Sequence, residues 1–413
     1  MKKHGMDPAR IDVLACAYKM VEDMERGLSG APSSMPMIPT YLKNDGGIRS
    51  GETAIVIDAG GTNFRTAVAT FTDGTCEISE LRKWSMPGID EPVTWEGFIS
   101  FVADCIMPVI HRAEKIGFCF SYPAEITAEI DGRVARIDKE VVVKGCKGQL
   151  VGASLLRELE SRGVFGKRVV ILNDTAAVLL GGAAKLDKSA YGGFIGQVSG
   201  TGTNTCCILP LHRIPKLNRD EDTGIIVNLE SGMYGDLPTG DLDAVLDDNS
   251  NIPGEKCLEK LTAGVYLGEL CRLCLLAAED EGLVSQSCAD FIREKGKFNA
   301  ATVDAWACGE GLDGLDSADA GFVSTVSRSL FERSAKCMAV NLTAILLLTG
   351  EGTDENKPVC ILAEGSLVQK SRIYAPLLRE FLAGSCAKLS RHAELHIDYE
   401  TTLPGSAAAA ILN

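Results

Sequence analysis

Two carboxylates that follow apolar runs are the residues of this chain best suited to chemistry. Asp58 ends the run 55–57, and Asp174 follows the run 168–172 and Asn173. A carboxylate at the end of a buried strand can hold a hydrated Mg²⁺ or accept the proton of a hydroxyl group. Asp174 has an alternative role as the N-cap of the helix expected after it, which aspartate performs well. The chain therefore contains a candidate metal-binding carboxylate and a candidate base.

Two glycine turns repeat one plan. Gly60 and Gly61 lie between Asp58 and the apolar run 66–71, and the stretch 193–209 has a similar order of apolar run, glycine–threonine turn and apolar run. Because glycine lacks a side chain, such a turn can adopt positive φ, and its N–H groups can approach a phosphate closely. Each turn alone has an ordinary hairpin as its alternative. Together they suggest two related halves facing one nucleotide, although two short matches do not establish a repeat.

Strands and helices are expected to alternate around these residues. Strand patterns occur at 53–71, 115–123, 168–172, 193–209, 360–368 and 395–399. Helical spacing of apolar residues occurs at 11–28, 95–112, 256–278, 322–349 and 403–412. This mixture predicts an α/β fold, and the helices after residue 256 predict that the second half forms the larger, more helical domain.

Length and composition limit the class of protein. A chain of 413 residues exceeds the size at which one core stops growing, so two domains are expected. With 46% apolar and 23% charged residues it has the balance of a globular protein. The net charge of −15 argues against nucleic-acid partners and against binding to anionic membranes.

The chain shows no apolar segment near the ~20 residues that a membrane span needs, and no signal-peptide core. A cytoplasmic location is therefore expected.

The 15 cysteines are scattered singly through apolar runs, which is typical of reduced core thiols. The pair Cys271 and Cys274 lies in a helical pattern and favours core packing over a metal or redox site.

Two other motifs carry little weight. The G-x-G-x-x-G match at 309–314 is not preceded by a strand and contains carboxylates where a pyrophosphate would bind. His392 and His396 are four apart, but Ala393 occupies the position of the glutamate in the zinc-binding motif. The sequence also lacks a Walker A motif, so the glycine turns must hold any nucleotide.

With both turns in view, the chain resembles the hexokinase family, within the actin-like phosphotransferase superfamily. Each matching motif is short, and their shared order over most of the chain is what makes the resemblance specific. A cysteine-rich zinc motif typical of the other bacterial sugar-kinase family is absent, which favours this branch. The main matches are Glu25-Arg-Gly-Leu28, Met37-Ile-Pro-Thr-Tyr41, Asp58-Ala-Gly-Gly-Thr-Asn-Phe-Arg65, Phe120-Ser-Tyr-Pro123, Asn173-Asp-Thr175, Gly200-Thr-Gly-Thr-Asn204, Asn228-Leu-Glu230, Gly235-Asp236, Tyr266-Leu-Gly-Glu-Leu270 and Gly365-Ser366.

The resemblance implies a two-domain actin-like (ribonuclease H-like) α/β fold with duplicated mixed-sheet cores and a cleft for sugar and ATP. The small domain is expected at 52–172 plus 405–413, and the large domain at 1–51 and 173–404. The implied activity is Mg²⁺-dependent transfer of the ATP γ-phosphoryl group to the 6-hydroxyl of a hexose, with glucose expected. The alternative from another class is a non-catalytic sugar-binding regulator with this fold. An actin- or chaperone-like ATPase would not need the sugar-suited residues.

The resemblance also implies roles for single residues. Asp174 is the expected base, with Lys144 and Arg65 stabilising charge. Lys144 has an exposed surface lysine as its alternative, and Glu230 and Glu259 could be solvated surface groups. A hexose needs partners of both hydrogen-bond polarities. The expected sugar contacts are Ser121, Lys144, Asn173, Asp174, Asn204, Glu230 and Glu259.

For the nucleotide, the resemblance implies that Asp58 holds Mg²⁺ through water. Val143 stands where the family usually has threonine, which leaves the hexose range open. The oligomeric state is also open. The expected ATP contacts are Asp58, Gly60, Gly61, Thr62, Asn63 and Arg65 at the first turn, Gly200, Thr201 and Gly202 at the second, and Gly365 and Ser366 along the adenosine.

Overall fold

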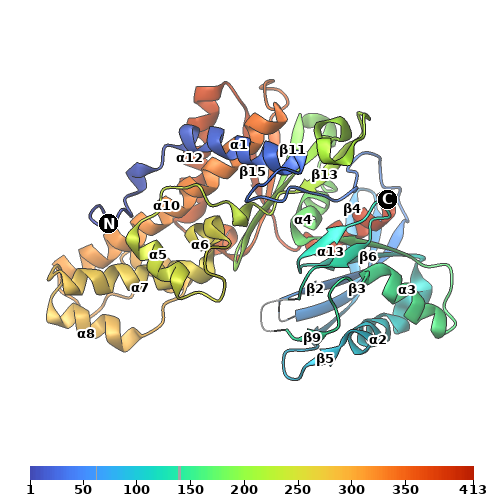
Figure 1. Cartoon of the computed structure of the whole chain (residues 1–413), viewed down its shortest axis with the longest axis horizontal. Helices are drawn as coiled ribbons and strands as arrows, with labels where there is room; N and C mark the ends of the chain where they lie inside the picture. Colours follow the sequence, from blue (N-terminus) through green and yellow to red (C-terminus); the bar gives the residue numbers. More distant parts are fainter. Residues whose placement is uncertain (62, 138–140) are drawn as a thin grey trace.

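The computed structural model describes residues 1–61, 63–137 and 141–413. These residues form two lobes, each built around one main sheet (Figure 1). The strand order is β10-β6-β2-β3-β4 in the first sheet and β1-β13-β12-β11-β14-β15 in the second. The strands are β1 Ile38–Pro39, β2 Thr53–Gly60, β3 Asn63–Thr72, β4 Thr75–Ser85, β6 Lys115–Phe120, β10 Arg168–Leu172, β11 Gly193–Ser199, β12 Thr203–Pro210, β13 Gly224–Asn228, β14 Val359–Glu364 and β15 Ala393–Ile397, with two small pairs, β5 Val93–Thr94 with β9 Val143–Lys144 and β7 Ala124–Ile126 with β8 Gly132–Val134.

Both main sheets have the same plan. In the first, β2, β3 and β4 form an antiparallel meander, and β6 and β10 continue the sheet in parallel with β2. In the second, β11, β12 and β13 form the meander, and β14 and β15 continue in parallel with β11. Because parallel strands end at the same edge of a sheet, the residues after β2, β6 and β10 meet at one edge.

Two helices lie between the sheets. α4 (Asp174–Ala183) packs on β11, β12 and β14, and α13 (Thr402–Leu412) packs on β2, β6 and β10. The helices also pack on each other, and glycine makes this close approach possible. A Cβ added at Gly405 would lie 1.9 Å from the carbonyl oxygen of Ala177. A shared apolar core of α4, α13 and both sheets therefore joins the two lobes.

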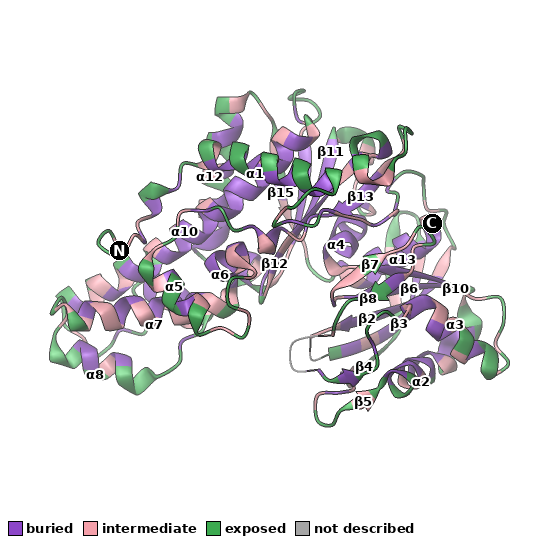
Figure 2. Cartoon of the chain, viewed as in Figure 1, coloured by how far each residue is buried: buried purple, intermediate pink, exposed green. Residues whose placement is uncertain are grey.

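Helices build the outer part of each lobe. α10 has 33 residues and packs on α1, α9 and α12, and Figure 2 shows buried residues along it and along β11. The Asp316 side chain caps its first turn, and Gly350 ends it with φ of 77°. The helices are α1 Val13–Ser29, α2 Trp95–Ile106, α3 Val151–Ser161, α4, α5 Asp241–Asp248, α6 Cys257–Thr262, α7 Gly264–Asp280, α8 Gln286–Lys295, α9 Ala300–Ala307, α10 Ser317–Thr349, α11 Ser366–Lys370, α12 Tyr374–Leu389 and α13.

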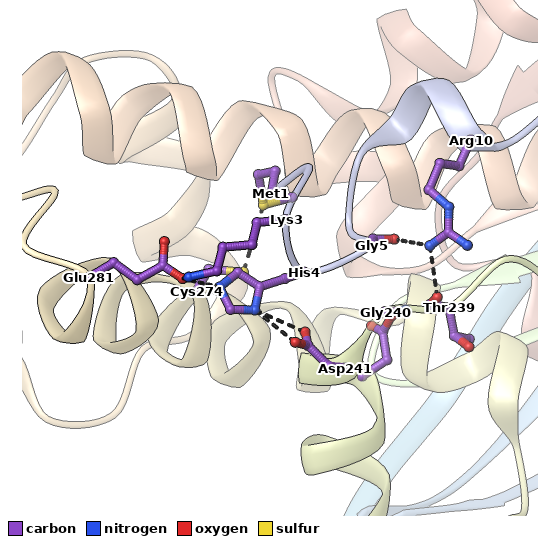
Figure 3. Close-up of polar contacts among 11 residues, drawn as sticks. Met1, Lys3, His4, Gly5, Arg10, Thr239, Gly240, Asp241, Cys274 and Glu281 are labelled. Carbon is purple, nitrogen blue, oxygen red and sulfur yellow. Dashed lines mark hydrogen bonds and ion pairs between the residues drawn. The ribbon is translucent and has the colours of Figure 1, made fainter.

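The first ten residues are fastened to the large lobe (Figure 3). The His4 ring contacts Asp241 of α5 at 2.9 Å through Nδ1 and Glu281 after α7 at 2.9 Å through Nε2. Arg10 donates to the carbonyl of Thr239 at 3.0 Å. These contacts hold the N-terminal segment against the chain that leads into α5.

The expected elements are present with some differences in their bounds, and the structure adds elements that were not expected, among them β4, β13, α3 and α12. The helix expected at 256–278 is broken at Ala263, whose ψ of 147° is extended, because the next N–H, of Gly264, donates to the carbonyl of Gly200 at 2.8 Å. The helix expected from 322 begins at Ser317. β4 was not expected, because most of its side chains are exposed and its apolar alternation is weak. Within the described residues, no helix is long and apolar enough to cross a membrane.

Candidate active site

Asp58, Ser121 and Asn173 meet at the shared edge of the first sheet. Asp58 pairs with Cys119 in the β2–β6 register, and the N–H of Ser121 donates to the carbonyl of Ala59 at 3.1 Å. A Cβ added at Gly60 would lie 3.3 Å from Ser121 Oγ and 3.6 Å from Asp58 Oδ1. The expected nucleotide turn, metal-binding carboxylate and sugar-binding hydroxyl are thus neighbours.

Asp58 forms an ion pair with Arg65 across the β2–β3 hairpin. Asp58 Oδ2 accepts from Arg65 Nε at 2.8 Å and from Nη2 at 2.6 Å. Burial raises the pKa of Asp58, Arg65 opposes this rise, and the charge of Asp174 adds to it. Arg65 therefore favours the ionised form of this buried carboxylate beside the turn.

The turn after Asp58 has the backbone that glycine permits. Gly61 has φ of 62°, and a Cβ there would meet open space. Its carbonyl accepts from the Tyr122 hydroxyl at 3.1 Å, and Asn63 pairs with Gly60 where β3 begins. The expected contact Thr62 lies outside the described residues.

The second turn adjoins the start of α11. The N–H of Gly200 donates to the carbonyl of Gly202 at 2.9 Å, and a Cβ added at Gly200 would lie 3.1 Å from the N–H nitrogen of Ser366. Gly365 has φ of 125° and approaches the carbonyl of Ser199 closely. Thr201 and Ser366 are exposed. The expected second phosphate turn and adenosine residues thus form one surface.

Asn173, and not Asp174, caps α4. Asn173 Oδ1 accepts from the N–H of Thr175 at 2.8 Å, and Asp174 is the first helical residue. The alternative role of Asp174 as an N-cap is therefore wrong. Its Oδ1 accepts from the hydroxyl of Thr175 at 3.2 Å, and its side chain is half-buried at the edge where the lobes meet.

Glu230 and Asn204 form a cluster on the second sheet. Glu230 Oε1 accepts from Asn228 Nδ2 at 2.7 Å and from Asn204 Nδ2 at 3.4 Å. Burial raises the pKa of Glu230, the Asn228 bond opposes this, and the charge of Asp174 adds to it. Glu230 is therefore a half-buried acceptor held by two amides, so the alternative of a solvated surface group does not apply. Sequence reasoning missed Asn228, although its spacing two residues before Glu230 was a usable signal.

Glu259 is tied to the second turn. Its Oε2 accepts from the N–H of Thr203 at 3.0 Å, its Oε1 lies 3.4 Å from Lys256 Nζ, and a Cβ at Gly202 would lie 2.8 Å from Oε2. Its side chain is 15% exposed. The alternative of a solvated helix surface is wrong for this residue.

A small cavity joins residues of both sheets. Asn173 lines it from the end of β10, and Asn228 and Glu230 line it from the second sheet. Asp174 follows Asn173 and acts electrostatically on Asp58 in one cluster and Glu230 in the other. Because Asn173 lies at the sheet edge shared with Asp58 and lines the cavity with Glu230, the adjacent Asp174 lies near both groups.

Lys144 stands apart from these residues. It lies on β9, which pairs in parallel with β5 on the side of the small lobe that faces the large lobe (Figure 1). It is exposed, and within the described residues no hydrogen bond or ion pair links it to the other predicted site residues. Its role stays a prediction.

Glu364 makes a structural contact. Its Oε2 accepts from the N–H of Thr401 at 3.0 Å and from the hydroxyl of the same residue. This side chain thus fastens the start of α13.

Asp58 is the residue best suited to hold a metal. In the described part of the chain, no group of three or more His, Cys, Asp or Glu could enclose an ion. A lone buried carboxylate beside a turn predicted to hold phosphates fits Mg²⁺, which keeps several waters and arrives with nucleotide phosphates.

Comparisons with known proteins give one family. A family model described as hexokinase matches residues 194–412, and a second with the same description matches residues 5–184. Relatives include hexokinase-1 of Schizosaccharomyces pombe, 30% identical over 280 residues, and hexokinase of Emericella nidulans, 31% identical over 273 residues. The alignments cover 64% and 62% of this chain but 57% and 55% of those relatives, so the match spans little more than half of their length.

Solved structures show the fold. The glucose-complexed hexokinase from Schistosoma mansoni superposes with a TM-score of 0.80 at 21% identity, over 98% of this chain and 96% of that one. Another hexokinase crystal structure gives a TM-score of 0.82 at 20% identity, over 98% and 97%. The predicted two-domain actin-like α/β fold is confirmed, and with the family models matching both halves, the chain belongs to the hexokinase family.

Proposed function

We propose that this protein is an ATP-dependent hexose kinase that transfers the γ-phosphoryl group to the 6-hydroxyl of a hexose, with glucose as the preferred substrate. The observation that carries the proposal is that Asp174 directly follows Asn173, which lies at the sheet edge of Asp58 and lines one cavity with Glu230. A non-catalytic sugar-binding regulator would not need a carboxylate there.

Asp174 would accept the proton of the attacking hydroxyl. A general base must reach the hydroxyl that it activates, and phosphoryl transfer otherwise depends on alignment and charge compensation. The hydroxyls of the hexose would bind Asn173, Asn204, Glu230 and Glu259, with Ser121 at the opposite sheet. Because these groups accept and donate in fixed directions, a sugar lacking one hydroxyl would leave a buried group unpaired.

The glycine turns would hold the phosphates of Mg-ATP. Asp58 would bind Mg²⁺ through water, and the N–H groups of both turns would contact phosphate oxygens, since such turns are anion-binding concavities. Mg²⁺ would neutralise phosphate charge during transfer. Gly365 and Ser366 would lie along the adenosine. Arg65 would stabilise negative charge on the γ-phosphoryl group during its transfer. The domain boundaries at 52, 172 and 405, the contribution of Lys144 and the cytoplasmic location stay predictions.

The test is ADP release with Mg-ATP and glucose, fructose, mannose, N-acetylglucosamine, glycerol or no sugar. We expect release that depends on a hexose, with the phosphorylated product identified by ³¹P NMR. Asp174→Asn should lower turnover about 10²–10⁴-fold while glucose still binds. Glu96→Gln, which removes an exposed carboxylate from the first turn of α2, is the matched control and should keep wild-type turnover. Glucose binding without phosphorylation in the wild type would favour the regulator.

A further inference from the structure

A buried amide on α10 lies beneath the proposed sugar site. Asn341 is 0% exposed in the middle of that helix, among apolar neighbours. Its Nδ2 lies 3.1 Å from Thr205 Oγ1 and its Oδ1 3.3 Å from the same hydroxyl. A buried amide is costly unless its groups are hydrogen-bonded, so its partner on β12 accounts for its presence in the core.

The hydroxyl of Thr205 connects Asn341 to the chain after Glu230. Thr205 Oγ1 lies 2.9 Å from Ser231 Oγ, and both residues are 0% exposed. The hydroxyl has one proton, so when it donates to Ser231 it accepts from the Asn341 amide. This gives one directed chain of hydrogen bonds from α10 through β12 to η6 (Ser231–Met233).

The same two residues hold the Asn204 amide. The N–H of Thr205 donates to Asn204 Oδ1 at 2.7 Å, and the N–H of Ser231 donates to it at 3.2 Å. Because Oδ1 is bound by two donors, Nδ2 must point the other way. It donates to Asn228 Oδ1 at 2.8 Å and toward Glu230 Oε1 at 3.4 Å. The orientation of Asn204 therefore follows from the positions of Thr205 and Ser231.

Glu230 depends on this arrangement. It has φ of 53°, an uncommon value for a residue with a side chain, and such a conformation persists only where the surroundings hold it. The N–H groups of Asn228 and Asn204 both point to its Oε1. Within the part of the chain that the structure describes, no hydrogen bond reaches its second oxygen, which can therefore accept from a hydroxyl of the ligand.

We propose that Asn341 is a positioning residue that fixes Asn204 and Glu230 for sugar recognition through Thr205 and Ser231. This inference rests on the proposed hexose kinase function. Asn341 does not touch the sugar. Removing the Asn341 amide should weaken sugar binding, because the amide of Asn204 and the carboxylate of Glu230 would lose their single orientation. Nucleotide binding should be unaffected, because the nucleotide turns are not part of this chain of hydrogen bonds.

The experiment measures glucose affinity by isothermal titration calorimetry without nucleotide, and the KM for glucose and for Mg-ATP. Asn341→Leu and Thr205→Val keep the side-chain shape and remove the chain of hydrogen bonds. Each should weaken glucose binding about 5–20-fold, the effect of losing one buried hydrogen bond, with the KM for Mg-ATP within about twofold of wild type. The double variant should resemble the single variants, because both act through one chain. Thr205→Ser, which keeps the hydroxyl, should keep wild-type affinity for glucose.

Thr343→Val is the matched structural control. Thr343 is also fully buried on α10, and its hydroxyl lies 2.8 Å from Ser385 Oγ of α12, outside the chain of hydrogen bonds. It should lose stability without changing glucose affinity. Equal affinity in wild type and Asn341→Leu, or equal losses in Asn341→Leu and Thr343→Val, would overturn the inference while leaving the kinase proposal intact. A wild-type chain that neither binds nor phosphorylates a hexose would overturn both.

Discussion

Replacing Arg65 by leucine should destabilise the protein, because the carboxylate of Asp58 would lose its ion-pair partner. The Asp58 side chain is 11% exposed and that of Arg65 is 28% exposed, and the two atoms of the ion pair are 2.6 Å apart. Removing one partner of a buried pair costs about 3–5 kcal/mol. Because water reaches part of Arg65, we expect a smaller loss of about 2–3 kcal/mol in the free energy of unfolding near pH 7.5.

The loss should depend on pH with a defined sign. Burial already raises the pKa of Asp58, and without Arg65 that pKa rises further. When the pKa of an aspartate is higher in the folded state than in the unfolded state, where it is about 3.9, the group stabilises the fold at pH values below that unfolded-state pKa. This stabilisation is lost as the pH rises through the folded-state pKa. The difference between Arg65→Leu and wild type should therefore be smaller at pH 5 than at pH 8.

Urea unfolding of wild type, Arg65→Leu, Asp58→Asn and the double variant measures the loss of stability independently of catalysis. Asp58→Asn should lose less stability than Arg65→Leu, because the amide can still accept from Arg65 and the guanidinium that remains is more exposed than the carboxylate. In the Arg65→Leu background, Asp58→Asn should restore at least about 1.5 kcal/mol, since it removes the unpaired carboxylate. Arg65→Leu as stable as wild type at pH 8, or no recovery in the double variant, would refute the reasoning.

Three further predictions concern stability and metal dependence. Burial raises the pKa of Glu351 to about 7, so Glu351→Gln should change urea stability little at pH 5 and raise it by roughly 1–3 kcal/mol at pH 8.5; an equal gain at both pH values would contradict this. Gly405→Ala should lower Tm because its Cβ would overlap the carbonyl of Ala177, whereas Gly384→Ala, with open space on α12, should stabilise by about 0.5–1 kcal/mol; equal Tm values would count against the packing argument. EDTA should abolish turnover and leave the affinity for glucose, measured by calorimetry, unchanged. Weaker glucose binding in EDTA would contradict this and would place the metal in the sugar site.

The parts of the site that are local in sequence could be predicted. A strand that ends in a carboxylate and a glycine turn is visible in one window, which is why Asp58, Gly61 and Gly200 were recognised. The parallel register of β2, β6 and β10 then brings the strand ends together. Strand and helix patterns gave part of the elements, among them β2, β11 and α10, because long periodic segments specify their own structure.

The rest depends on contacts between distant segments. Asn341 is 136 positions from Thr205, and its only local signal is one amide within an apolar helical run. The break at Ala263 follows from a hydrogen bond to Gly200, which the helical pattern of 256–278 does not reveal. Asp174 was given the capping alternative because aspartate and asparagine are both good caps, and only the structure shows which of the two neighbours performs it.

The contacts of the acidic residues give a physical reason for assigning the base to Asp174. Asp58 is paired with Arg65, Glu259 accepts a backbone N–H and faces Lys256, and Glu230 accepts from two amides. Oxygens that already accept from protein donors have fewer lone pairs left for the hydroxyl of a substrate. Among the described residues, Asp174 has the hydroxyl of Thr175 as its single side-chain partner and forms no ion pair. It also lies at the start of α4, where the shared core joins the lobes. The carboxylate least committed to other partners is thus the one near both the sugar-type and the phosphate-type groups, where a proton must be accepted.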